Sequence, residues 1–326
     1  MAIFKSIQDH KRWTGILFVL MTTLCFSQNP KVYTGLLHAH TAFSDGSGTP
    51  EEAFKMAQKS GLDFFAVTEH NHAEAEQGAK ERTDGILISN NHALYNGTGK
   101  ISITPKNGTK ISVKSLISAA GEAKTSDFLP IYGQEFSTIS SGNHMNVLGI
   151  NEVLEIENGS FDDLIDLVAK LKKEGKAVPV LQLNHPDVAA DLFYSGTPAK
   201  KQKNDYGLDD YDQDFHKLIE QTDEFVSLIE VLSGPAMKKK PIPNYRYEDT
   251  HENDYFFYLV QGFHISPSVG HDNHYKTWGS MVDSRMGVIA EALTQESVFE
   301  GFRNNRTYAT EDKNLKVYYK INDKLM

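Results

Sequence analysis

The chain has 326 residues, of which 40% are apolar, 10% aromatic and 23% charged. These proportions are typical of globular proteins and exclude a disordered tail, a collagen-like repeat and a coiled coil. Lys and Arg number 33 against 43 Asp and Glu, which gives a formal net charge of -10. Because such a surface repels a polyanion, we expect no duplex nucleic acid as a partner.

The first 27 residues have the pattern of a secretory signal peptide. Basic residues precede an apolar run, Trp13–Phe26, and small or polar residues follow it. The run is shorter than the roughly 20 residues that a membrane-spanning helix needs. We therefore expect an exported protein, periplasmic or extracellular, without stable membrane insertion after cleavage; a retained membrane anchor is the alternative. The one cysteine, Cys25, lies in this segment, so the exported chain would bind metals through His, Asp and Glu.

After the signal segment, apolar runs typical of buried strands alternate with helical patterns. Strands are expected at Val32–His40, Asp63–His70, Leu129–Phe136, His144–Ile150, Ala177–His185, Phe225–Ser233, Ser266–His271 and Arg285–Ala290. This alternation predicts an α/β protein with a mostly parallel sheet. Seven or so such units are enough to close into a TIM-like barrel.

Helices are expected between several of these strands. Thr49-Pro50-Glu51-Glu52 has the form of a capping box with proline in the first turn, which predicts a helix that ends near Gly61. The other expected helices are Phe161–Lys173, Phe215–Thr222, Tyr255–Gly262 and a segment from Thr294 to about Asn304. No linker divides the chain, so we expect one barrel over residues 28–314 and a tail over 315–326.

Long polar inserts follow three of the strands, at Ala73–Ser126, Asp187–Asp214 and Gly234–Asp254. In a parallel barrel they would lie at the rim that carries active sites. They would either shape a substrate pocket or decorate the surface.

Residues of metal-ligand type stand at almost every strand end. His38 and His40 are two residues apart, so a strand would place both side chains on one face. The others are Asp45, His70, Glu135, His144, His185, Asp272 and His274. Because strand ends of a barrel converge on one rim, the pattern predicts a metal-binding cluster there.

The ordered motifs H-A-H-x4-D, T-E-H-N-H, G-x-E, H (His144), N-H-P and D-x-H resemble those of the PHP (polymerase and histidinol phosphatase) family, over about residues 34–310. Within that family, the chain looks most like the secreted CehA/McbA-type metallohydrolases, and Arg285–Asn314 is similar to that branch too. The resemblance implies a distorted (β/α)7 barrel with its metal site at the C-terminal ends of the strands. It also implies that residues 315–326 could be the first strand of a truncated β-sandwich.

The resemblance further implies a trinuclear metal centre. The nine candidates would divide into His38, His40 and Asp272 at the first ion, Asp45, His70 and His274 at the second, and His144 and His185 at the third, with Glu135 bridging. Neutral imidazoles combined with carboxylates suit Zn²⁺, Mn²⁺ or Fe²⁺ better than Mg²⁺ or Ca²⁺. We therefore expect two to three divalent transition-metal ions.

Such a centre would attract a phosphate ester, because three divalent ions outweigh three carboxylates. A water between the ions would lose its proton near neutral pH and attack phosphorus. The sequence therefore predicts an exported phosphatase or phosphodiesterase that cleaves a small-molecule phosphoester by a metal-bridging hydroxide. The alternatives are hydrolysis of a carboxylic or carbamate ester at the same site, and a non-catalytic metal-binding surface protein.

Five residues outside the ligand set carry further predictions. His72 could donate a proton to the leaving group or have a structural role. Lys238, Lys239 and Arg246 could bind substrate, although a lysine run is usually a solvated surface. Glu230 could support a metal-binding histidine or pack in its strand. The natural substrate, the metal and the oligomeric state stay open.

Overall fold

The computed structural model describes residues 30–71, 88, 91–104, 108–137, 144–157, 160–186, 222–248, 250–322 and 324–325. The predicted signal segment, His72 and the insert at 187–214 lie outside these residues, as does the expected helix at 215–222 apart from its last residue. Within the described part of the chain, no helix has the length and hydrophobicity to cross a membrane.

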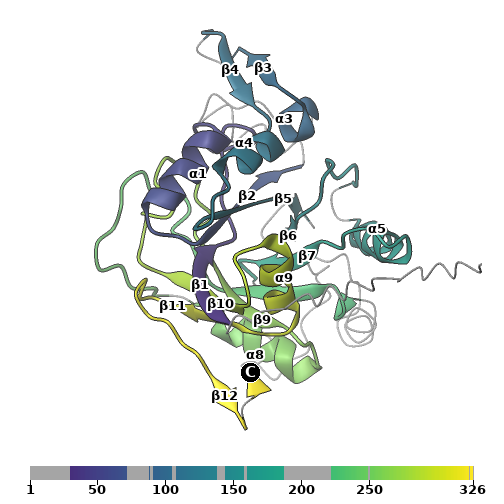
Figure 1. The fold of residues 1–326 in the computed structure, drawn as a ribbon, viewed down its shortest axis with the longest axis vertical. Coiled ribbons are helices and arrows are strands. Elements are labelled where there is room, and N and C mark those ends of the chain that lie inside the picture. Colours follow the sequence, from purple (N-terminus) through teal and green to yellow (C-terminus); the bar gives the residue numbers. More distant parts are fainter. Residues whose placement is uncertain are drawn as a thin grey trace, which may run out of the picture.

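Nine strands form one curved sheet (Figure 1). In spatial order they are β11 (Thr307–Thr310), β10 (Arg285–Ala290), β1 (Lys31–Leu36), β2 (Phe64–His70), β5 (Leu129–Ser137), β6 (His144–Leu148), β7 (Val180–Asn184), β8 (Val226–Ser233) and β9 (Ser266–Gly270). The segment after β1 meets β9, since the Leu37 amide donates to the Val269 carbonyl and Ala39 bridges in parallel to Asn273. Strands β1, β2 and β5 to β9 thus make a nearly closed barrel, which confirms the predicted fold.

The sheet is parallel in only part of the barrel. The pairs β1–β2, β2–β5, β7–β8 and β8–β9 are parallel, whereas β6 runs antiparallel to both β5 and β7. The reversal of β6 has a consequence for the site. His144, its first residue, pairs in register with Ser137 and Asn184 at the ends of the neighbouring strands. His144 therefore reaches the same rim although it begins its strand.

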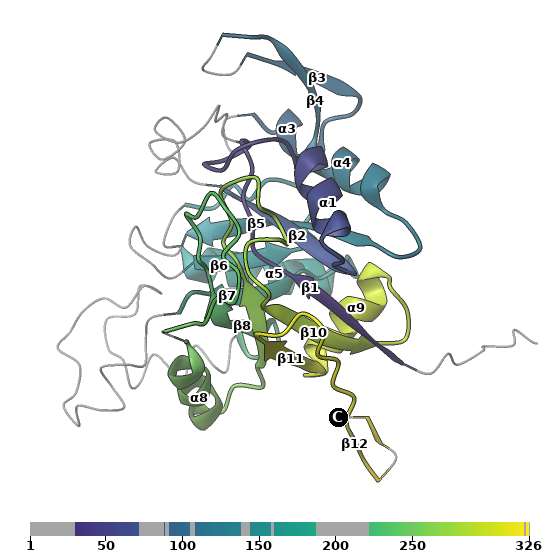
Figure 2. The same ribbon diagram turned by 90° about the vertical axis from the view of Figure 1, so that its left-hand side faces the viewer.

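The helices cover the outside of the barrel (Figure 2). The four that the sequence predicts are α1 (Pro50–Lys59), α5 (Phe161–Lys173), α8 (Glu252–Gln261) and α9 (Gln295–Arg303). Helix α1 buries Ala53, Phe54 and Ala57, and the Phe54 ring packs edge-on against Phe65 of β2. Apolar burial between helices and strands therefore forms the main core outside the barrel.

Part of the insert at 73–126 has structure of its own. Its described residues form α3 (Ala93–Asn96), the hairpin of β3 (Lys100–Ile103) with β4 (Ile111–Lys114), and α4 (Leu116–Ala123). Figures 1 and 2 show the hairpin projecting beyond α3 and α4. These elements were not predicted; α3 and both strands are only four residues long, too short for a periodic pattern to stand out.

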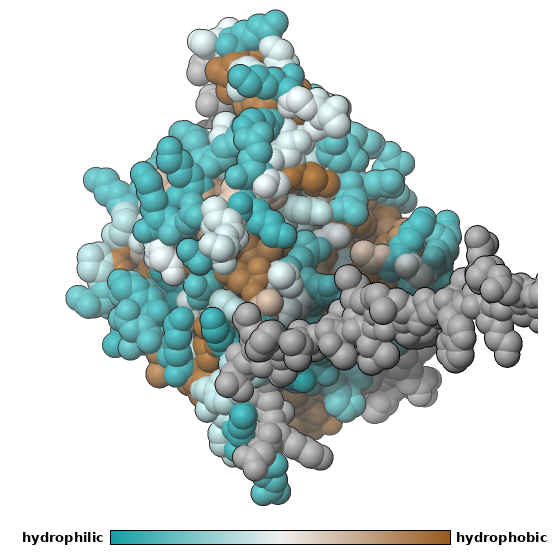
Figure 3. Space-filling model, viewed as in Figure 1, coloured by the Kyte–Doolittle hydropathy of each residue, from teal (hydrophilic) through white to brown (hydrophobic). Residues whose placement is uncertain are grey.

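The tail after residue 314 leaves the barrel. It ends in a short hairpin of β12 (Lys320–Ile321) and β13 (Lys324–Leu325), and the side chains of Leu315, Val317 and Tyr319 are exposed. Whether this segment begins a β-sandwich stays a prediction. Elsewhere, the face seen in Figure 3 is mostly hydrophilic, with hydrophobic residues in small separate groups.

The N-terminal cap of α1 is a first test of the fold. Thr49 Oγ1 accepts from the Glu52 amide at 3.3 Å, and Glu52 Oε2 accepts from the Thr49 amide at 3.0 Å. Replacing Thr49→Ala removes one acceptor of this capping box and should lower the free energy of unfolding by about 1 kcal/mol, measured by urea denaturation. The exposed Thr98 caps no helix, and Thr98→Ala is the control. Equal losses in both variants would contradict the role of the cap.

Candidate metal centre

Two histidines after β1 and one carboxylate from β5 meet inside the barrel mouth. His38 and His40 are fully buried, and their Nε2 atoms lie 3.1 Å and 3.0 Å from the two oxygens of Glu135. Asp272, which follows β9, places Oδ1 3.2 Å from His38 Nε2 and 3.1 Å from His40 Nε2. These four side chains form a group whose ligand atoms are close enough to bind one cation.

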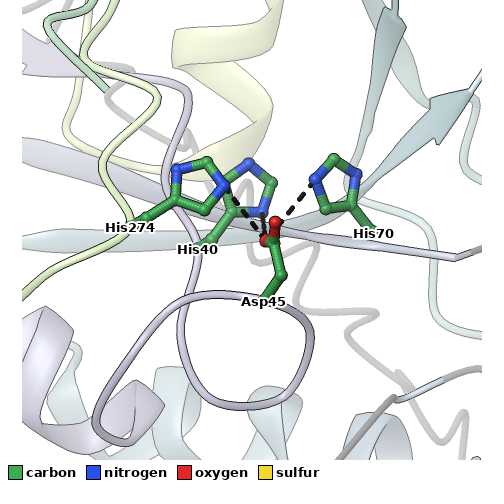
Figure 4. A group of neighbouring side chains, drawn as sticks. All are labelled: His40, Asp45, His70 and His274. Carbon is green, nitrogen blue, oxygen red and sulfur yellow. Dashed lines mark ion pairs between the residues drawn. The ribbon is translucent and has the colours of Figure 1, made fainter. Parts of the chain in front are cut away.

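A second group lies beside the first and shares His40 with it (Figure 4). Asp45 rises from the loop between β1 and α1, and its Oδ1 lies 3.0 Å from His274 Nε2 and 3.5 Å from His70 Nε2. The rings of His70 and His274 each lie 4.3 Å from the His40 ring, centroid to centroid. Three imidazoles thus surround one carboxylate.

A third group joins His70, His144 and the same Glu135. His70 Nδ1 lies 3.2 Å from Glu135 Oε2, and His144 Nδ1 lies 3.0 Å from Glu135 Oε1. His185, after β7, places Nε2 3.3 Å from Glu135 Oε1. All nine predicted ligands are therefore in one connected cluster. His40, His70 and Glu135 each belong to two of the groups, so the division of the nine residues among three ions stays a prediction.

Charge in this cluster is shared between imidazoles and carboxylates. Burial opposes a charge on Glu135, but His38, His70 and His144 outweigh it and hold the pKa of this carboxyl well below its usual range. Burial likewise opposes ionisation of Asp45, yet His70 and His274 lower its pKa. The carboxylates thus stay ionised at neutral pH, which is the state that binds a cation. Buried carboxylates among imidazole nitrogens therefore fit a divalent metal.

The sequence-based interpretation missed a carboxylate that holds the loop carrying Asp45. Glu69, buried in β2, accepts hydrogen bonds from the Thr41 amide at 3.0 Å and from the hydroxyls of Thr41 and Ser44. Its sequence signal was an acidic residue inside an otherwise apolar strand. Asn184 was missed too; its Nδ2 donates to Glu135 Oε1 at 2.9 Å.

The predicted substrate contacts lie on the loop between β8 and α8. Lys238 and Lys239 are exposed, and Lys239 Nζ lies 4.8 Å from the centre of the Tyr275 ring, next in sequence to His274. Arg246 instead pairs with Glu311 at 2.7 Å. Roles in substrate binding for these three residues stay predictions, as does that of His72, which is outside the described residues.

The comparisons with known proteins agree with this geometry. The PHP domain family model matches residues 37–256, more than half of the chain. The chain therefore belongs to the PHP domain family. This assignment confirms the predicted family, whereas membership of the CehA/McbA branch stays a prediction.

Among solved structures, the chain is similar to the two-domain PHP-like metal-dependent phosphoesterase of Bacteroides vulgatus, with 17% identity and a TM-score of 0.51. The match covers 87% of this chain and 66% of the Bacteroides vulgatus chain, so this chain spans less than two thirds of the length of that protein. A metal-dependent phosphoesterase of Bifidobacterium adolescentis matches with 13% identity and a TM-score of 0.37, over 83% of this chain and 96% of that one. No curated protein matches the sequence.

One comparison corrects the sequence-based view of the partners. Endonuclease Q, solved with a 27-mer duplex substrate, matches with 12% identity and a TM-score of 0.39, over 88% of this chain and 62% of that one. The exclusion of duplex nucleic acid, and with it the restriction to small molecules, is therefore wrong. The inference from net charge failed because net charge averages over the whole surface, whereas a ligand experiences only the local electrostatic field at one rim of the barrel.

Metal binding at this site should depend on pH. Burial lowers the pKa of His40, but hydrogen bonds with Asp272 and Glu135 outweigh it and raise the pKa to about 10. A cation needs the neutral imidazole, so at lower pH it must displace a bound proton. We expect Zn²⁺ affinity to rise from about pH 6 to about pH 8, by roughly tenfold per unit for each displaced proton. Competition with a chelator of known pH dependence measures it, and an affinity independent of pH would contradict this picture.

Proposed function

We propose that this protein is an exported phosphoesterase that hydrolyses phosphate mono- or diesters with two to three divalent transition-metal ions. The observation that carries the proposal is the cluster of six imidazoles and three carboxylates around Glu135. Its members are His38, His40, Asp45, His70, Glu135, His144, His185, Asp272 and His274. Zn²⁺, Mn²⁺ and Fe²⁺ are the ions that suit this set of nitrogen and oxygen ligands.

The burial of the cluster indicates from which side a substrate approaches. The side chains of His38, His40 and Glu135 are at most 1% exposed, whereas those of His144, Asp272 and His185 are 17%, 18% and 24% exposed. The ester therefore approaches past His144, Asp272 and His185. The buried members exclude water from the inner side and hold the geometry fixed.

Divalent ions bound here would supply a water nucleophile at neutral pH and stabilise charge on the phosphate oxygens. The chain's own residues set the charge balance that a phosphate meets. With the three carboxylates of the cluster, two divalent ions would leave a net charge of about +1 and three would leave about +3. An anionic ester would thus be attracted more strongly with three ions than with two.

Metal analysis with a panel of esters tests the proposal. We expect the purified protein to contain Zn, Mn or Fe and to cleave p-nitrophenyl phosphate or its bis ester. Glu135→Gln should lose bound metal and reduce turnover at least about 100-fold, because one carboxylate contacts five of the imidazoles. The exposed Glu122, paired with Lys114, gives the control Glu122→Gln.

The panel also includes an aryl acetate, an aryl carbamate and a DNA duplex with an abasic site. Turnover of only the carbon esters would replace the phosphoester assignment with the alternative ester hydrolase. A protein free of transition metal that still cleaves the phosphate esters would contradict the proposed site.

Export is a separate part of the proposal and is supported by the composition of residues 1–27. Expressed in a bacterium with this segment, the protein should be found outside the cytoplasm with a mass lower by about 27 residues. A chain starting at residue 28 should stay in the cytoplasm. Equal distribution of both chains, or an uncleaved segment, would contradict export by a signal peptide.

A further inference from the structure

A single buried carboxylate behind the cluster contacts two of the predicted ligands at once. Glu230, on β8, is fully buried and points into the barrel. Its Oε1 lies 2.9 Å from Nδ1 of His38, and its Oε2 accepts from the main-chain amide of His185 at 2.9 Å. Gln182 also donates to Oε1, at 3.3 Å. Glu230 thus connects the segment after β1 with the turn after β7.

The contact with His38 determines which ring nitrogen faces the cluster. A carboxylate only accepts hydrogen bonds, so the proton that it shares with His38 sits on Nδ1. Nε2, which lies 3.1 Å from Glu135 and 3.2 Å from Asp272, is then the nitrogen that would release its proton when a cation binds. The contact with Glu230 therefore turns Nε2 of His38 toward the place where a cation would bind.

The contact with His185 supports an unfavourable backbone conformation. His185 has φ = 28°, in a region that residues other than glycine rarely adopt. The hydrogen bond from its amide to Glu230 Oε2 holds this turn, which directs His185 Nε2 to 3.3 Å from Glu135 Oε1. Without that acceptor, the turn would relax and move the ring.

The neighbouring strand β9 leaves space for this carboxylate. Gly270 ends β9, and a Cβ atom placed there would lie 1.7 Å from Glu230 Oε1 and 2.7 Å from His38 Cβ. Both distances are far below van der Waals contact, so the Glu230 carboxylate has to shift to make room for the Cβ atom. Any residue larger than glycine at position 270 would therefore displace Glu230 from His38.

We infer that Glu230 is a positioning residue that orients His38 and His185 for metal binding, and that Gly270 is required for it. The inference rests on the proposed metal-dependent function, because it concerns ligands of that site. Three groups donate to Glu230: His38 and Gln182 to Oε1, and the His185 amide to Oε2. An amide of the same shape has only one acceptor, so Glu230→Gln satisfies the donors on one side and places an NH₂ group against a donor on the other.

The test compares Zn²⁺ affinity with folding stability in the full chain. We expect Glu230→Gln to fold but to bind Zn²⁺ roughly 10- to 100-fold more weakly in chelator competition. The control is Gln134→Leu, which removes a buried side chain whose hydrogen bonds go to the main chain of Glu152 and Leu154 and, among the described residues, to none of the nine predicted ligands. That variant should lose stability in urea, measured with EDTA, but keep the wild-type Zn²⁺ affinity.

A second variant covers the case in which Glu230→Gln does not fold. Gly270→Ala leaves every charge in place but crowds both the Glu230 carboxylate and His38 Cβ, so it should weaken Zn²⁺ binding at least as much as Glu230→Gln. Wild-type affinity in the folded variants would overturn the inference while the proposed function stands. An affinity loss in Gln134→Leu as large as that in Glu230→Gln would also overturn it. A wild-type protein that binds neither Zn²⁺ nor Mn²⁺ would overturn both the proposed function and the inference.

Discussion

The stability of the folded barrel depends on balancing the charge of one buried carboxylate, that of Glu135. Glu135 is 1% exposed, and a charge in such a place is costly unless opposite charge or a cation lies beside it. Five imidazoles lie within 3.3 Å of its oxygens, and they come from four separate parts of the chain. The strands must therefore converge for the charge to be tolerated. Bringing the histidines together around Glu135 and bringing the strands of the barrel together are therefore the same structural requirement.

The two faces of each strand have different roles: one packs in the apolar core, and the other carries polar groups inside the barrel. On β2, Phe65 packs against Phe54 of α1, whereas His70 points into the barrel mouth. On β7, Gln182 and Asn184 are two residues apart and share a hydrogen bond of 3.0 Å inside the barrel. Because side chains alternate between faces, the apolar outer layer stabilises the fold while the inner layer holds polar groups that an apolar core would exclude.

The features that could be predicted from the sequence are those that a local pattern of residues determines. Apolar runs located all eight expected strands, the box at Thr49 located the start of α1, and the ligand-type residues at strand ends came together in one cluster. The reversal of β6 was not predicted, since an apolar run has no direction. His144 was included among the ligands by its motif, and only the pairing with Ser137 and Asn184 shows why a strand that begins with a ligand reaches the same rim.

Contacts between distant strands were beyond the sequence for a related reason. Glu69 was missed, and for Glu230 support of a metal-binding histidine was predicted as one of two roles without the histidine being identified. Their partners lie 25 to 28 and 45 to 192 residues away. Composition cannot supply such pairings. Yet burying a carboxylate in an apolar strand costs free energy unless hydrogen-bond donors surround it. Each of these two residues therefore implied a hydrogen-bond donor before the fold was known. The positions where local preference is violated are therefore those where the site is built.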